Sequence, residues 1–271
     1  VWRYISEPNT TTTYSIDAAV SPDAGWVVHS APVGERERLD LLRLSDRKRL
    51  TIASDKQATL YCPAFSSDGR QVACLRTPLG VDEDDPSAPP GAEVQVMAWD
   101  GGGRRTLARD AYGHLPPSFS PDGNRLAYVN AEGSLSIVDL QTGAVSRVPV
   151  QAPWWPAEAP LWSPDRAALA CSACQFRGLS PVGIHADRPR RVVWVAADGS
   201  ASGHVTGVTL HGWHDTSSLD VYAVGYHIPA RASYRRLLRV DLNGSLKTVL
   251  RQAEAVLYAP ALSPNGRLVA A

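Results

Sequence analysis

The sequence predicts an all-β fold: one β-propeller domain, residues 1–271, built from six four-stranded antiparallel blades. Three observations support this prediction. A short turn motif recurs along the chain, its copies are spaced at the period of propeller blades, and the two ends of the chain hold complementary parts of one blade. Composition agrees, because 21 glycines and 21 prolines favour many turns over long helices.

The recurring motif is best formed at Ser120-Pro-Asp-Gly-Asn-Arg-Leu-Ala-Tyr128, which indicates a strand end, a tight Asp-Gly turn and an apolar returning strand. A bulky apolar residue often precedes it, as at Phe119 and Trp162. Variants begin at Ser21, Ser66, Ser163 and Ser263, and a degenerate copy begins at Trp213. Successive copies lie roughly 43 to 54 residues apart, which is the spacing expected of four-stranded blades.

Each interval between motifs predicts four strands, which we call a to d in chain order. In the third interval, strand a ends at 117–120, strand b is 125–129, strand c is 134–140 and strand d is 144–150. The fifth interval repeats this order with 222–225, 237–242 and 246–250. Within a blade, the a to b and c to d turns lie on one face, and the b to c and d to a connections lie on the other.

The two ends of the chain complement each other. The last copy stops at Ala271 after strands a and b, whereas Val1–Ile5 and Thr11–Ser15 precede the first complete turn. Because an exposed sheet edge is a liability, propellers close their ring by pairing strands from both termini in one blade. We therefore expect Val1–Ile5 to pair with Arg267–Ala271 in the blade that Leu257–Ala271 begins.

With its Ser-Pro-Asp-Gly turns followed by Leu-Ala-Tyr or an equivalent, the chain resembles the WD40-like repeats of TolB-type six-bladed propellers over nearly its whole length. That family includes periplasmic TolB, propellers of bacterial lipoproteins and membrane proteins, and the gating propeller of prolyl-oligopeptidase-like enzymes. The resemblance implies a binding scaffold and leaves the ligand open. The fifth copy departs from the pattern with His214-Asp-Thr-Ser217, which leaves the register of that blade open by about one residue.

Charge and hydropathy limit the kinds of partner that we expect. Lysine plus arginine equals aspartate plus glutamate at 27 each, so no global field attracts nucleic acid or an anionic membrane. No run reaches the roughly 18 to 20 apolar residues of a membrane span. The chain begins at Val1 without methionine, so we expect a processed or trimmed product with an export signal or anchor upstream, located in the periplasm, secreted or anchored outside the cytoplasm.

Loop lengths predict which face binds. The a to b turns are tight, whereas the b to c connections are long at 76–93, 175–191 and 226–236, and long loops on a rigid scaffold commonly carry function. Side chains on this face either recognise a peptide, glycan or partner protein, or pack between blades. We predict the main site there, with these residues: Tyr61, Tyr112, His114, Trp154, Trp155, Glu158, Arg177, His211 and Tyr258.

Charged segments give weaker signals. Asp82, Glu83, Asp84 and Asp85 could supply oxygens to Ca²⁺, but the segment lacks the ligand spacing and turn glycine of a calcium loop, and nearby prolines favour a solvated excursion. Clustered arginines at 188, 190 and 191 indicate either an anion or acidic-partner site or a solvated loop. His211 and His214 with Asp215 do not converge on one metal ion, because strand residues three apart point to opposite faces.

Four cysteines are present. Counted outward from the Asp68-Gly69 turn, Cys62 comes opposite Cys74, a separation that a cross-strand disulfide can bridge. Cys171-Ser-Ala-Cys174 has neither a second pair at zinc-site spacing nor the context of a redox motif. The even count is consistent with an oxidising compartment, and small buried thiols are the alternative.

Catalytic motifs are missing from the sequence: it has no Gly-x-Ser-x-Gly elbow, His-Glu-x-x-His, phosphate loop or dinucleotide glycine pattern. Glu158 is one carboxylate near the mouth, whereas glycoside hydrolysis needs two. We therefore predict a non-catalytic extracytoplasmic scaffold, without a cofactor, that binds a protein or a small ligand. The alternatives are the gating propeller of a prolyl-oligopeptidase-like enzyme, or a relative of it, and a stand-alone sugar-active propeller enzyme.

Overall fold

The computed structural model describes residues 18–34, 36–80, 91–113, 115–150, 153–174, 190–227, 232–243, 246–251, 261–262 and 269–270. Every regular secondary-structure element in these ranges is a β-strand, which confirms the all-β prediction. The strands are β1 Ala18–Val20, β2 Trp26–Val33, β3 Arg36–Arg43, β4 Arg49–Ala53, β5 Ala58–Phe65, β6 Gln71–Pro78, β7 Ala92–Ala98, β8 Arg105–Ala111, β9 Ser118–Phe119, β10 Arg125–Val129, β11 Leu135–Asp139, β12 Val145–Val148, β13 Trp155–Pro156, β14 Leu161–Trp162, β15 Ala168–Cys174, β16 Arg190–Ala196, β17 Ser202–Thr206, β18 Val208–Trp213, β19 Ser218–His227, β20 Ala232–Asp241, β21 Leu246–Arg251, β22 Ala261–Leu262 and β23 Val269–Ala270.

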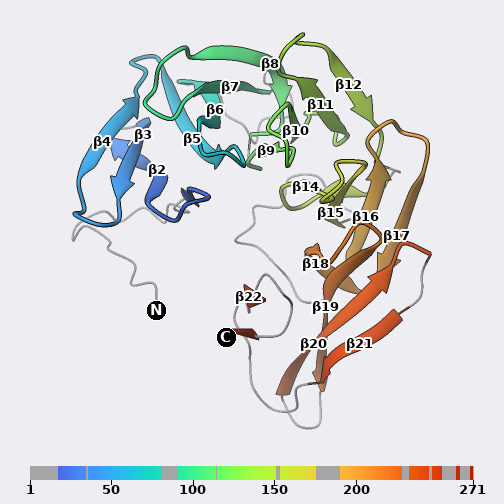
Figure 1. Ribbon diagram of the computed structural model, residues 1–271. Coiled ribbons are helices and arrows are strands. Elements are labelled where there is room, and N and C mark those ends of the chain that lie inside the picture. The colour runs from blue at the N-terminus through green and yellow to red at the C-terminus, as the bar shows by residue number, and fades with distance from the viewer. Residues whose placement is uncertain are drawn as a thin grey trace.

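The strands form antiparallel sheets that follow one another along an arc (Figure 1). The first blade is β1–β4, the second β5–β8, the third β9–β12, the fourth β13–β17 and the fifth β18–β21, and β22 pairs with β23. Each blade opens on the strand before the turn motif, as the sequence predicts. The expected ring closure depends on Val1–Ile5, which lie outside the described residues, so it stays a prediction.

The apolar cores lie between neighbouring blades. Successive side chains of a strand point to opposite faces, so Val72 and Cys74 of β6 pack against the first blade, while Ala73 and Leu75 pack against the third. Both faces of an interior blade are thereby covered. This explains why β15 is buried at every position.

The repeated turn is held by its serine and aspartate. The Ser120 hydroxyl donates to Asp122 at 2.6 Å and accepts the backbone N–H of Arg125 at 3.0 Å. The residue after the aspartate has a positive φ, 71° at Gly123 and 67° at Arg166. The same serine to aspartate bond recurs in the first, second and fourth blades, at Ser21 and Asp23, Ser66 and Asp68, and Ser163 and Asp165.

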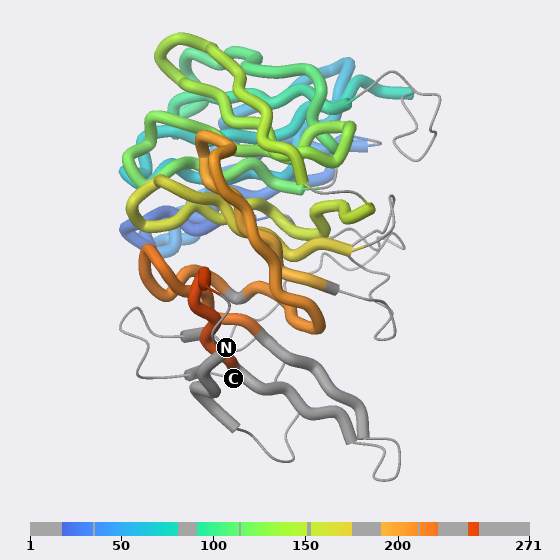
Figure 2. Tube along the Cα trace, turned by 90° about the vertical axis from the view of Figure 1, so that its right-hand side faces the viewer, coloured from blue at the N-terminus to red at the C-terminus, as the bar shows by residue number. Residues whose placement is uncertain are grey.

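The two faces of the molecule are distinct. Seen from the side, the repeated turns project to one side, and the end of β6, where a long connection leaves, lies on the other (Figure 2). We call the first the turn face. The second, which carries the b to c and d to a connections, is the long-connection face.

Candidate functional site

Two of the predicted binding aromatics belong to the core between blades. Trp154 is 6% exposed and packs in the cluster between the third and fourth blades. Tyr61 is 8% exposed, and its hydroxyl is hydrogen-bonded to the Thr77 hydroxyl at 2.8 Å. Of the two alternatives that the sequence left open, packing between blades describes these two side chains, because the neighbouring blade covers them.

Three other predicted residues surround this cluster. Tyr112 is half-buried against it, and Trp155 is half-buried where a Cβ on Gly133 would come within 2.3 Å of its ring. Glu158 is exposed, in the gap between β13 and β14, which both pair with β15. Burial raises the pKa of the Cys171 thiol to about 12, and the negative charge of Glu158 contributes to the same shift. Trp155 and Glu158 thus belong to the fourth blade, whereas Tyr112 lies in the connection that leads into the third.

The remaining predicted residues are not placed. His114, Arg177 and Tyr258, and the acidic segment with Asp82, Glu83, Asp84 and Asp85, lie outside the described residues. For His211 only the backbone is described, in β18 beside a bulge between Leu210 and Gly212.

Arg191 is the most distinctive charged group at this edge. Its guanidinium lies 3.5 Å from the centre of the Trp154 ring, and the residue pairs across β15 with Ala173. Its Nε is buried and has no hydrogen-bond partner within the described residues. Burial lowers the pKa of Arg191. Stacking on an indole leaves the edge of a guanidinium available for an oxyanion.

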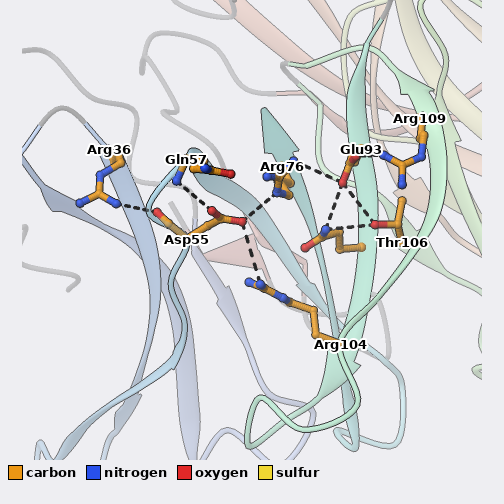
Figure 3. A network of polar contacts seen from close by, with 9 residues as sticks. Arg36, Asp55, Gln57, Arg76, Glu93, Arg104, Thr106 and Arg109 are labelled. Atoms are coloured by element: carbon orange, nitrogen blue, oxygen red, sulfur yellow. Dashed lines mark hydrogen bonds and ion pairs between the residues drawn. The ribbon is translucent and has the colours of Figure 1, made fainter. Parts of the chain in front are cut away.

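A polar network at the long-connection face joins the first and second blades (Figure 3). Arg76 bridges two carboxylates, with Nε 2.9 Å from Asp55 Oδ2 and Nη1 3.5 Å from Glu93 Oε2. Arg109 also pairs with Glu93, and Arg36 of the first blade donates to the Asp55 carbonyl oxygen at 2.7 Å. This network ties the two blades together, since Asp55 lies in the connection between them.

Further donors complete the network. The pKa of Asp55 is lowered mainly by the hydrogen bond from the backbone N–H of Gln57. The neighbouring Arg76 lowers it further. Thr106 and the Gln95 amide both donate to Glu93 at 3.2 Å. The donors and the two carboxylates largely satisfy one another, so we assign the network a structural role.

The turn face holds a pocket of about 280 Å³ where the turns of the first and second blades meet. Tight a to b turns therefore do not exclude a concave surface on this face. Trp99, on the turn that follows β7, was not singled out from the sequence; its ring centre is 5.6 Å from that of Trp26. The lining residues are Ser21, Pro22, Asp23, Trp26, Phe65, Asp68, Gly69, Arg70 and Trp99.

Cys62 and Cys74 are both free, buried thiols in the structure, and the expected placement of one opposite the other is disturbed. A bulge between Tyr61 and Ala64 shifts the register of β5 on β6, so Cys62 is not directly opposite Cys74. Cys62 packs in the core toward the third blade, whereas Cys74 packs in the core toward the first. The two side chains therefore lie on opposite faces of one sheet.

Among the residues that the structure describes, no three histidine, cysteine, aspartate or glutamate side chains gather as a metal site would require. Nor do those residues contain a helix of the length and apolar character needed to cross a membrane.

Comparison with known proteins supports the propeller. Residues 51–164 match the family model of the lipoprotein LpqB β-propeller domain. No curated protein matches the sequence significantly. The oligogalacturonate lyase of Vibrio parahaemolyticus superposes with a TM-score of 0.62 at 14% identity, over 95% of this chain and 72% of that one. A protein assigned as TolB in Agrobacterium tumefaciens gives 0.53 at 16% identity, over 87% and 80%.

A prolyl endopeptidase structure gives a TM-score of 0.59 at 15% identity over 90% of this chain, which spans 37% of that protein. Identities this low show a shared fold. The resemblance to TolB-type propellers is thus confirmed as one of architecture.

Proposed function

We propose that this chain is a non-catalytic propeller scaffold outside the cytoplasm, which binds a protein or small ligand on its long-connection face through a carboxylate or similar anion held by Arg191. The propeller fold and the LpqB match support the scaffold and its location. The chemistry of the lyase and peptidase relatives is not carried over, because the likeness to them is one of fold.

The environment of the Arg191 guanidinium is the observation that indicates an anionic ligand. A guanidinium prefers bidentate contact with a carboxylate, and a buried donor without a partner costs about 1 to 3 kcal/mol. Arg191 has such a donor in Nε and stacks on Trp154. A bound oxyanion would satisfy the donor without disturbing the stack.

Arg125 provides an internal control, since its guanidinium also stacks on an indole, 4.6 Å from the centre of the Trp162 ring. Its Nη2 donates to the Arg166 carbonyl oxygen at 2.8 Å. Titration with sodium acetate, at constant ionic strength set with chloride, should shift the NMR signal of the Arg191 Nε–H saturably and leave that of Arg125 in place. Equal, non-saturating shifts at both arginines would contradict the proposal.

The proposal includes a ring of six blades closed by the N-terminal segment. Deletion of the first eight residues should then lower the free energy of unfolding by several kcal/mol, because it opens a blade edge. An unchanged melting temperature would argue against closure. The membrane-anchored or secreted context is tested separately, by sequencing the full gene product: an upstream anchor supports the scaffold, and a downstream hydrolase domain supports a peptidase gate.

A further inference from the structure

The turns of neighbouring blades are linked differently at each junction. Between the third and fourth blades, Arg166 reaches back to Asp122, with Nη1 2.7 Å from Oδ2. Between the second and third, the Ser67 hydroxyl donates to the Pro121 carbonyl oxygen at 2.6 Å. These two junctions therefore both have a direct polar bridge between their turns.

The junction of the first and second blades lacks both bridges. Its turn residues correspond by motif position: Asp23 to Asp122, Gly69 to Arg166, and Pro22 to Ser67. Gly69 has no side chain to reach Asp23, and proline has no hydroxyl to donate. Accordingly, no hydrogen bond or ion pair links segments 21–25 and 66–70 among the contacts of the described residues.

The pocket occupies the place left by the missing arginine. Asp23 and Gly69 both line it, and Pro22 lies 3.4 Å from the position of a Cβ on Gly69. Asp23 forms no ion pair within the described residues, although Ser21 and the Gly25 N–H lower its pKa and keep it ionised. Within the described part of the chain, the site therefore presents a carboxylate that has no cationic partner and lies beside an open space.

An aromatic surface adjoins that carboxylate. Trp26 already carries the Arg43 guanidinium 4.7 Å from its ring centre, which shows that cations stack on this cluster. Trp99 is 39% exposed, and no described cation stacks on its ring. A guanidinium above an indole and next to a carboxylate gains from both contacts.

We propose that this pocket receives an arginine side chain of a partner polypeptide, which pairs with Asp23 and stacks on Trp99 as a substitute for the missing counterpart of Arg166. The inference goes beyond the proposed function, because it concerns the turn face and a cationic group. A partner polypeptide is favoured over a sugar or other neutral ligand by the unpaired carboxylate and by the guanidinium contact that the chain itself makes at Asp122.

The test uses the blocked peptide acetyl-Gly-Arg-Gly-amide and its citrulline analogue, which has nearly the same shape without the charge. We expect the arginine peptide to shift the indole N–H signal of Trp99 saturably, and Asp23→Asn to weaken that binding about fivefold. Asp241→Asn, in the fifth blade, should leave it unchanged. An equal response to the citrulline peptide, or none to the arginine peptide, overturns the proposal.

A second variant fills the pocket from within. Gly69→Arg supplies the residue that the fourth blade has, and Arg166 shows that arginine is tolerated at a φ of 67°. Gly69→Ala is the matched control, because it imposes the same backbone strain without a guanidinium. We expect Gly69→Arg to abolish the Trp99 response to the peptide and Gly69→Ala to retain it. Binding that survives in Gly69→Arg overturns the proposed position of the guanidinium.

Discussion

The indole N–H of Trp162 donates a hydrogen bond to the carbonyl oxygen of Ser118, 3.0 Å away in the preceding blade. The fifth blade repeats this contact, since Trp213 donates to the Leu161 carbonyl oxygen at 2.9 Å. In the fourth and fifth blades, the tryptophan before the turn thus has a polar role as well as an apolar one, because its indole N–H binds the preceding blade.

Replacing Trp162 with phenylalanine should lower the free energy of unfolding by about 1 to 2 kcal/mol, because the Ser118 carbonyl loses its donor while most of the ring volume remains. Urea denaturation measures the change. Trp162→Ala should cost about 3 to 5 kcal/mol, since it also leaves a cavity in the core. A phenylalanine variant as unstable as the alanine variant would show that packing alone matters.

Asp122 should make stability depend on pH. The Ser120 hydroxyl, and next Arg166, hold its pKa well below the usual value of about 4. A depressed pKa in the folded state contributes stability that is complete above about pH 4 and is lost as pH falls toward the folded pKa. Asp122→Asn should therefore destabilise the protein at pH 7, and the difference from wild type should shrink at pH 3.

Urea unfolding at pH 7, 5 and 3 measures this effect. Asp241→Asn serves as the control, because Asp241 is exposed and lies outside the turn motif. A difference between wild type and Asp122→Asn that stays constant over this range would contradict the assigned pKa direction.

Trp154 should behave as a core residue. Because it is buried between two blades, Trp154→Ala should lower the free energy of unfolding by about 3 to 5 kcal/mol. Trp154→Phe should cost less and should keep a ring beneath Arg191. If the alanine variant unfolds at the wild-type urea concentration, the side chain is not the core element described above.

The sequence predicted the hairpins well because their determinants are local. A serine, an aspartate and a residue with positive φ lie within four positions of one another, and their bonds close the turn without help from distant residues. The burial of Trp154 could not be predicted from local sequence in this way. Its burial depends on how the next blade packs, which no local pattern records.

The bulge at Cys62 and the pocket beside Trp99 escaped prediction for related reasons. Cys62 has a φ of 52°, an uncommon conformation for a residue other than glycine, so simple counting from the turn gave the wrong register. The pocket forms because glycine and proline occupy positions where later blades have arginine and serine. Comparison of the motif copies position by position could have revealed that difference.

Glu93 should be important for joining the first two blades. Its side chain is largely buried and pairs with Arg76 and Arg109, so Glu93→Gln leaves the largely buried Arg76 guanidinium with less compensation. We expect a loss of about 2 kcal/mol in the free energy of unfolding. A double-mutant cycle with Arg76→Gln should show coupling, and strict additivity of the two changes would contradict the network.

Cysteine reactivity tests the corrected register. Burial raises the pKa of both Cys74 and Cys171 to about 12, and alkylation requires the thiolate. In the folded protein at pH 8, both should therefore react very slowly with iodoacetamide, and both should react promptly in urea. A time course followed by mass spectrometry measures the rates.

Rapid modification of either residue under native conditions would contradict its burial. A Cys62 to Cys74 cross-link formed by a mild oxidant in the folded protein would contradict the placement of these two side chains on opposite faces of the sheet.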